Sequence, residues 1–266
     1  MDNLVNYDYA TLETMLRSFL WPFFRISGMY MSMVVFGSRL VSRPIRVTLS
    51  FLVTLVVIPV LPEMPAVELM GFNAFIITIH QLLIGIAVGF TSRLIFEAFV
   101  LGGKLIAMQS GLGFAMLNDP SSGVSVPVVG QFFLMITTLV FLSLDGHLMM
   151  LQIIIQSFDT LPVSTSGLKL ESISALINFT SWIFAAGLMM AFAALISLLM
   201  INISFGILTK ASPALNIMTI GFPMTIIAGL LIVWVTVSGF MPHFDQQFAR
   251  GKQVMCALVL MECSNG

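Results

Sequence analysis

Charged residues are missing from several long stretches of the chain, and this absence constrains its fold more than any other feature. No Asp, Glu, Lys or Arg occurs in residues 47–62, 69–92, 120–144, 172–209 or 211–244. A helix of about 20 mostly apolar residues crosses the ~30 Å hydrocarbon core of a bilayer. A further segment, residues 19–36, is apolar apart from Arg25. The sequence therefore predicts an all-α membrane protein.

The composition supports this interpretation and excludes other classes of protein. Hydrophobic residues make up 58% of the chain and charged residues 9%, whereas about 25% are charged in an average globular protein. The net charge of -1 leaves no basic surface for the phosphates of a nucleic acid. Asp2, Asp8 and Glu13 precede Arg17, which is the wrong charge order for a cleavable signal peptide, so we expect the N-terminus to stay attached.

Residues typical of enzymes and metal sites are not found in the patterns that such sites require. The sequence contains no His-Glu-x-x-His, no phosphate-binding glycine loop and no paired acidic residues in facing apolar helices. Cys256 and Cys263 are seven residues apart, a spacing that indicates neither a metal site nor a dependable disulfide. We expect free thiols, no metal, no cofactor and no enzymatic activity. His80 and Gln81, in an apolar helix, are more typical of an interhelical hydrogen bond than of a ligand site.

Apolar segments alternate with short links along the chain. They predict helices near residues 15–36, 46–62, 71–108, 124–158, 172–208 and 214–240. The interval 159–171 is rich in turn-forming residues and is predicted to be a loop. We expect two unequal parts, an N-terminal helical half (1–160) and a C-terminal helical hairpin (171–250), followed by a tail (251–266).

The stretch 172–209 is too long for a simple membrane span. As one straight helix it reaches about 57 Å, nearly twice the thickness of a bilayer core. It could form a hairpin without a polar turn, tilt steeply, or extend beyond the lipid under cover of other proteins. We favour cover by other subunits, because a bare apolar helix in water is unfavourable.

Glycine and proline predict two breaks in the apolar segments. Gly221 and Pro223 flank Phe222, and a proline there predicts a kink or break that yields two half-helices. The carbonyls freed by such a break require neighbouring protein or a wet cavity. Gly146, between Asp145 and His147, predicts a turn between helices and only weakly suggests a proton relay.

Basic residues give a partial prediction of membrane topology. Arg39, Arg43 and Arg46 lie in one short link, which should face the cytoplasm. The next link carries Glu63 and Glu68 and should therefore lie outside. By the same alternation Arg93 returns to the inside, and the topology after residue 104 stays open.

The most unusual segment is residues 109–127. It contains three glycines and two prolines, which argue against a regular helix, yet its first half is too apolar for a solvated loop. Irregular backbone at membrane depth is tolerated where it is buried in protein or lines a cavity. A loop that blocks a conduit and an apolar loop in the headgroup zone explain the segment equally well. The candidate plug residues are Met108, Gly111, Leu112, Gly113, Phe114, Ala115 and Met116.

Charges within apolar segments indicate contacts or an aqueous path. Arg93, Glu97 and Lys104 share one stripe of a predicted helix, and Arg93 can pair with Glu97. We interpret this stripe, with Arg25, as a subunit contact or pore rim. An interfacial helix explains the stripe equally well, and the partner of Arg25 cannot be identified from the sequence.

Several short motifs, in order, resemble the FliR family of flagellar type III export-gate subunits, which has counterparts in virulence secretion. The resemblance covers residues 17–245. It rests on the residues Arg25-Ile-Ser-Gly28, Phe36-Gly-Ser-Arg39, Arg46, Gln109-Ser-Gly-Leu-Gly-Phe-Ala115, Asp119-Pro120, Asp145-Gly-His-Leu148, Ser157-Phe-Asp-Thr-Leu-Pro162, Ser212-Pro-Ala-Leu-Asn216 and Ile220-Gly-Phe-Pro223.

The resemblance implies an architecture and partners that the residues alone do not provide. It implies a single-copy subunit with long inclined helices, assembled with several copies of two sister membrane subunits and with other export-apparatus membrane proteins. It places the assembly in the bacterial inner membrane, at the flagellar basal body, in contact with lipid and partly projecting on the periplasmic side. Unfolded flagellar proteins are the implied substrates, and residues 111–116 the implied plug. The tail 251–266 matches no part of the family pattern.

Two other functions are compatible with the residues. A secondary transporter for a small solute would place its site at the break around Pro223, beside Arg93 and Glu97. An integral membrane enzyme, the weaker alternative, would need Asp145, His147 and Glu97 to meet in space.

Overall fold

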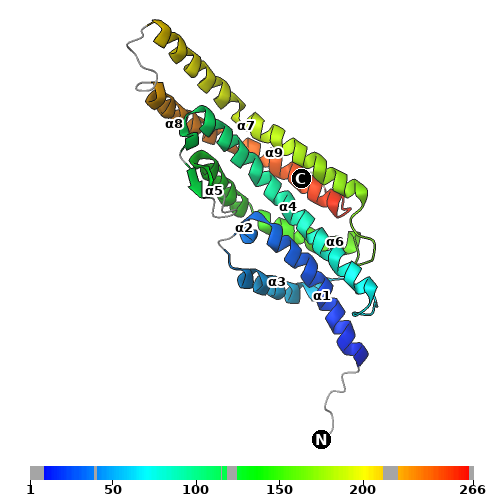
Figure 1. Cartoon of the computed structure of the whole chain (residues 1–266). Coiled ribbons are helices and arrows are strands. Elements are labelled where there is room, and N and C mark those ends of the chain that lie inside the picture. Colours follow the sequence, from blue (N-terminus) through cyan, green and yellow to red (C-terminus); the bar gives the residue numbers. More distant parts are fainter. Residues whose placement is uncertain (1–8, 39–40, 115, 119–124, 212–220, 264–266) are drawn as a thin grey trace. The chain divides into compact units, whose positions relative to one another are not determined.

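The computed structural model describes residues 9–38, 41–114, 116–118, 125–211 and 221–263. Its long elements are all helices (Figure 1), which confirms the predicted fold class. The helices are α1 (Tyr9–Ser32), α2 (Val34–Gly37), α3 (Arg43–Val57), α4 (Phe72–Gln109), α5 (Val128–Ser143), α6 (Gly146–Thr160), α7 (Leu170–Ala211), α8 (Phe222–Ser238) and α9 (Phe240–Leu258). Two short 3-10 helices, η1 (Ile58–Val60) and η2 (Leu112–Phe114), and two strands, β1 (Met116–Asn118) and β2 (Ser125–Pro127), complete the described chain.

Among the described residues, three segments are long and apolar enough to cross a membrane: Arg43–Val60, Phe72–Gln109 and Leu170–Lys210. The bent pairs α5–α6 and α8–α9 could each form one further span. The helix α7 has 42 residues and is therefore about 63 Å long. The stretch 172–209 is thus one continuous helix, so a hairpin without a polar turn is excluded. Steep inclination, or extension beyond the lipid, remains as the explanation of its length.

The predicted break at Gly221 and Pro223 is the start of a helix. Gly221 precedes α8 and Pro223 lies in its first turn, where the missing N–H of proline costs no helical hydrogen bond. Residues 212–220 lie outside the described residues, so the kink with its two half-helices stays a prediction. A further break lies at Gly239, where α8 and α9 meet at 56°.

The turn predicted at Gly146 is present. Asp145 has a φ of 53°, and Gly146 is the first residue of α6. The sequence-based helix 124–158 is thus two helices, α5 and α6, separated by this turn.

Contacts within the chain group its residues into two compact units. Unit 1 comprises residues 1–93, 145–177 and 252–266, and unit 2 comprises residues 94–144 and 178–251. Each unit takes residues from both predicted halves, so the division into 1–160 and 171–250 stays a prediction. The described part of the predicted tail is the end of α9 and the segment after it; Gly251 belongs to unit 2 and residues 252–263 to unit 1.

In unit 1, helices α1 and α4 lie in direct backbone contact. A Cβ added to Gly85 would lie 2.0 Å from the carbonyl oxygen of Arg25, and one added to Gly28 would lie 2.6 Å from the carbonyl oxygen of Leu82. Only glycine permits this approach, as the Gly85-x-x-x-Gly89 spacing suggests.

A buried arginine, Arg25, lies at this contact between α1 and α4. Arg25 is 0% exposed. Its Nε donates to Oε1 of Gln81 at 2.7 Å, and its terminal nitrogens donate to Oγ and the carbonyl oxygen of Ser157 and to the carbonyl oxygen of Leu161, at 2.8, 3.0 and 2.9 Å. The guanidinium also lies over the Phe158 ring, 4.0 Å from its centroid. One side chain from α1 therefore joins α4 and the end of α6.

In unit 2, aromatic rings form the core between α4, α5 and α9. Phe99 and Phe240 have ring centroids 4.9 Å apart, and Phe244 and Phe248 are stacked at 5.5 Å. The same helix α9 contacts α7 through Trp182, whose Nε1 donates to Oε1 of Gln247 at 2.9 Å. The last predicted helix ends near residue 240 and does not include α9, because charged residues interrupt the apolar pattern there.

We expect Arg25→Met to destabilise unit 1 by about 4 kcal/mol or more, because four acceptor atoms lose their donor at about 1–3 kcal/mol each. The measurement is the thermal unfolding midpoint of the purified complex. The control is Arg17→Gln, which removes only the i, i+4 pair between Arg17 and Glu13, a loss of about 0.5 kcal/mol. Equal midpoints for the two variants would contradict the role given to Arg25.

Candidate functional site

The candidate site is the glycine loop of unit 2, residues 108–118, which begins where α4 ends. Ser110 is 0% exposed, and its N–H donates to the carbonyl oxygen of Ile106 at 3.0 Å. Gly111 follows with a φ of +79°, a left-handed conformation that ends helices and favours glycine. The chain therefore leaves α4 at a fixed residue and in a fixed direction.

The loop then forms a short structure that the sequence did not predict. After η2, strand β1 pairs with β2 in antiparallel register, with Met116 opposite Pro127 and Asn118 opposite Ser125. Pro127 directly precedes α5. The excursion between α4 and α5 is thus closed at its base by a two-stranded ladder. Ala115 and residues 119–124 lie outside the described residues.

Helices α7 and α8 pack against the first residues of the glycine loop. A Cβ added to Gly111 would lie 3.1 Å from the Phe222 ring. A Cβ added to Gly229 would lie 2.4 Å from the Cβ of Ser110. On the other side, Nδ2 of Asn202 donates to the carbonyl oxygen of Gln109 at 3.4 Å. The start of the loop is therefore contacted from two sides by helices of its own unit.

Close to the two ends of the loop, α4 and α5 approach each other so closely that glycine is required. A Cβ added to Gly103 would lie 2.7 Å from the Cα of Gly130. The aliphatic stem of Lys104 packs on the same place, since a Cβ added to Gly130 would lie 3.4 Å from its Cγ. The two helices that flank the loop are thus closely packed at its base.

The structure places the glycine loop beside the break predicted at Gly221 and Pro223. The helix start at Gly221 and Pro223 is also where Phe222 meets Gly111. Among the predicted plug residues, Met108 is 68% exposed, and Gly111, Leu112 and Gly113 are half-buried.

The charged stripe of α4 has a different environment from Arg25. Arg93 and Glu97 are exposed and Lys104 is half-buried. The ion pair found among the described residues joins Glu13 and Arg17, so the predicted Arg93–Glu97 pair is not formed. Arg25, the fourth member of the predicted set, has its partners inside unit 1.

The residues that support the loop were not predicted from the sequence. Ser110 lies inside the motif that carries the family resemblance and could have been found there. Phe222, Thr225, Gly229 and Asn202 contact the loop from distant parts of the chain, and no local pattern identifies them. The described residues contain no group of three or more His, Cys, Asp or Glu side chains that could hold a metal ion.

We expect Gly111→Ala to lower the free energy of unfolding of unit 2 by about 1–2 kcal/mol, because an L-residue is strained in the left-handed conformation, and the new Cβ crowds Phe222. Thermal unfolding and protease accessibility of the loop measure the effect. Gly206→Ala is the matched control, since a Cβ there has nothing within 4 Å and alanine favours a helix. A Gly111→Ala protein as stable as this control would contradict the proposed constraint.

Comparison with known proteins shows the family to which the chain belongs. The model of the bacterial export proteins, family 1, matches residues 16–251. The chain is 34% identical to the flagellar biosynthetic protein FliR of Pectobacterium carotovorum subsp. carotovorum, over 93% of this chain and 94% of that protein. It is 32% identical to FliR of Escherichia coli strain K12, over 88% and 90% of the two chains, and 30% identical to FliR of Buchnera aphidicola subsp. Acyrthosiphon pisum, over 91% and 94%. The chain therefore belongs to family 1 of the bacterial export proteins.

Proposed function

We propose that this chain is a single-copy subunit of the flagellar type III export gate and that its glycine loop is a plug in the protein-conducting channel. Membership of the export family, with FliR proteins as relatives, makes the chain a component of the flagellar export apparatus in the inner membrane. The channel, the plug and the single copy are the further steps of the proposal. No catalytic residue or cofactor is assigned.

The main support for the plug is an irregular, apolar loop that starts from a closely packed pair of helices, α4 and α5. A plug must return to the same place after each substrate has passed, and this requires a fixed point of attachment. Gly111, Ser110 and the Gly103–Gly130 contact supply such a point in unit 2. The described loop itself has few regular hydrogen bonds to lose on displacement, since its ladder has three residue pairs.

The chemistry of the loop suits a barrier to ions. An apolar constriction blocks ions because it cannot replace their hydration shell. Leu112 and Met108 belong to the described apolar residues at this position. Methionine is unbranched and flexible, so Met108, at 68% exposed, is suited to closing around chains of different shape.

Long helices with exposed apolar side chains support the proposed assembly. Trp234 on α8 is 75% exposed, and Phe184 and Phe192 on α7 are 63% and 56% exposed. Because α7 is about 63 Å long, lipid alone does not cover it. We propose that several copies of two sister membrane subunits, together with lipid, cover these faces in an assembly that projects partly on the periplasmic side.

The remaining predicted sites have a place in this proposal. Arg93 and Glu97, which are exposed on α4, and Lys104 form a contact with a sister subunit or the rim of the channel. Other export-apparatus membrane proteins and unfolded flagellar substrates are the further partners. The energy for export comes from other components of the export apparatus.

The plug is tested by replacing residues 111–116 with six Gly and Ser residues in cells that contain the native partners. The chain length stays the same, so the assembly should form, but the apolar barrier is lost. We expect the cells to become permeable to small ions and dyes, measured by dye uptake and ion flux. Gly206→Ala serves as the control and should leave the cells sealed.

Normal assembly together with unchanged permeability would contradict the plug. Assembly is checked separately, by co-purification with the sister subunits. A solute transporter would instead be stable and active when purified alone, so the same purification also separates the two functions.

A further inference from the structure

The end of the chain fastens the link between α6 and α7 in unit 1. Oγ1 of Thr160, the last residue of α6, donates to the carbonyl oxygen of Val259 at 2.6 Å. Oγ of Ser172, in the first turn of α7, donates to the carbonyl oxygen of Ala257 at 3.2 Å. The side chain of Val259 is 0% exposed. Both ends of the link 161–169 are therefore tied to the same short segment.

This segment is closed on itself by a disulfide between Cys256 and Cys263, with Cα atoms 5.9 Å apart. The expected free thiols are thus a wrong prediction. Spacing alone did not reveal that the chain reverses after α9, where Leu260 has a φ of 57° and the N–H of Met261 donates to the carbonyl oxygen of Cys256 at 2.9 Å. We call residues 256–263 the C-terminal hook.

The hook combines a protected sulfur with an accessible one. Cys256 is 1% exposed, whereas Cys263 is half-buried. Cys263 also lines a cavity of about 220 Å³ with Gln152 and Gln156 of α6 and with Lys252. A reducing thiol can therefore reach the disulfide at Cys263, while Cys256 stays buried in the fold.

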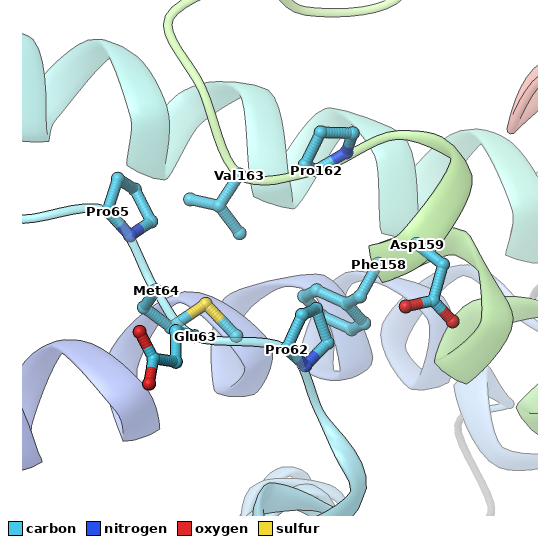
Figure 2. Close-up of a pocket in the computed structure, with 8 residues that line it drawn as sticks. All are labelled: Pro62, Glu63, Met64, Pro65, Phe158, Asp159, Pro162 and Val163. Atoms are coloured by element: carbon cyan, nitrogen blue, oxygen red, sulfur yellow. The ribbon is translucent and has the colours of Figure 1, made fainter.

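The charges of unit 1 indicate which side of the membrane the hook faces. Figure 2 shows the chain after α3 beside the end of α6: Glu63 and Pro65 line one cavity together with Asp159 and Pro162. The acidic link therefore lies at the same end of unit 1 as the link that the hook fastens. The opposite end of α3 begins with Arg43.

Two independent arguments then agree on the orientation. Cytoplasmic links carry an excess of Lys and Arg, so the acidic end should face away from the cytoplasm. Disulfides persist in oxidising compartments outside the cytoplasm. Both place the hook on the outer side of the inner membrane.

We propose that the C-terminal hook is a redox-sensitive strap, which locks the α6–α7 link on the outer side of the membrane when Cys256 and Cys263 are joined. The family match ends at residue 251, so the strap lies outside the matched part of the chain. The proposal of a strap does not rest on the proposal that the glycine loop is a plug.

The strap closes by thiol–disulfide exchange with an oxidant that itself carries a disulfide. One cysteine thiolate attacks the oxidant and forms a mixed disulfide, and the second thiolate then displaces the oxidant's sulfur. The two cysteines lose two protons and two electrons, and the oxidant leaves as a dithiol. A dithiol reductant reverses these steps.

The first experiment measures the redox state and the side of the membrane in intact cells that contain the full chain and its partners. The chain has two cysteines in all, so labelling reports on this pair alone. Cells are trapped with acid, denatured and labelled with a polyethylene-glycol maleimide. We expect no mass shift without reductant, and a shift of two labels after treatment with a membrane-impermeant phosphine. Labelling without reductant, or only after permeabilisation, would overturn the proposal.

The second experiment tests the strap by trypsin cleavage of the link at Lys169 in the purified complex. Reduction of the unmodified protein should increase the cleavage rate at least about tenfold, because loss of a disulfide frees the segment that protects the link. The double variant Cys256→Ser/Cys263→Ser should be cut at that higher rate without reductant and should not respond to it.

Thr160→Val is the matched control, because it removes one tie to Val259 but keeps the disulfide. Its cleavage should still respond to reductant. A cleavage rate that reductant does not change in the unmodified protein would overturn the strap. That comparison needs no variant, so it decides the question even if the double variant does not assemble.

Discussion

Backbone and side-chain polar groups at membrane depth must find hydrogen-bond partners within protein, and the structure follows from this constraint. Continuous helices such as α4 and α7 satisfy it locally, since their bonds lie within the helix. Arg25 satisfies it through four hydrogen bonds inside unit 1. The glycine loop has only the short η2 and a ladder of three residue pairs to satisfy it, so protein must lie against its entry. A loop with this support fits the proposed plug and would be costly against lipid.

The long helices could be predicted from the sequence because their signal is local. The predicted helix 71–108 and the helix α4 agree at both ends within one residue, and uncharged length alone identified α7. Gly111 was identified as unusual because glycine is needed where φ is positive. Local patterns failed where charge interrupts a helix, as at Asp245 and Arg250 in α9.

Contacts between distant segments could not be predicted. The acceptors of Arg25 lie 56 to 136 residues away in the chain, and no periodic pattern connects Arg25 with Ser157 or Leu161. The same limit hid the packing of Phe222 on Gly111 and the reversal that joins Cys256 to Cys263. Its glycines, its prolines and the family resemblance all pointed to the loop, but none of them indicated which residues hold it.

The most direct measurement of the central claim is imaging of the chain purified with its native membrane partners. The account predicts that residues 111–116 lie on the central axis of a closed assembly, enclosed by protein, and that the apolar faces of α7 and α8 contact sister subunits. A loop found on the outer surface, in water or in the lipid headgroups, with α7 and α8 facing lipid along their length, would contradict it.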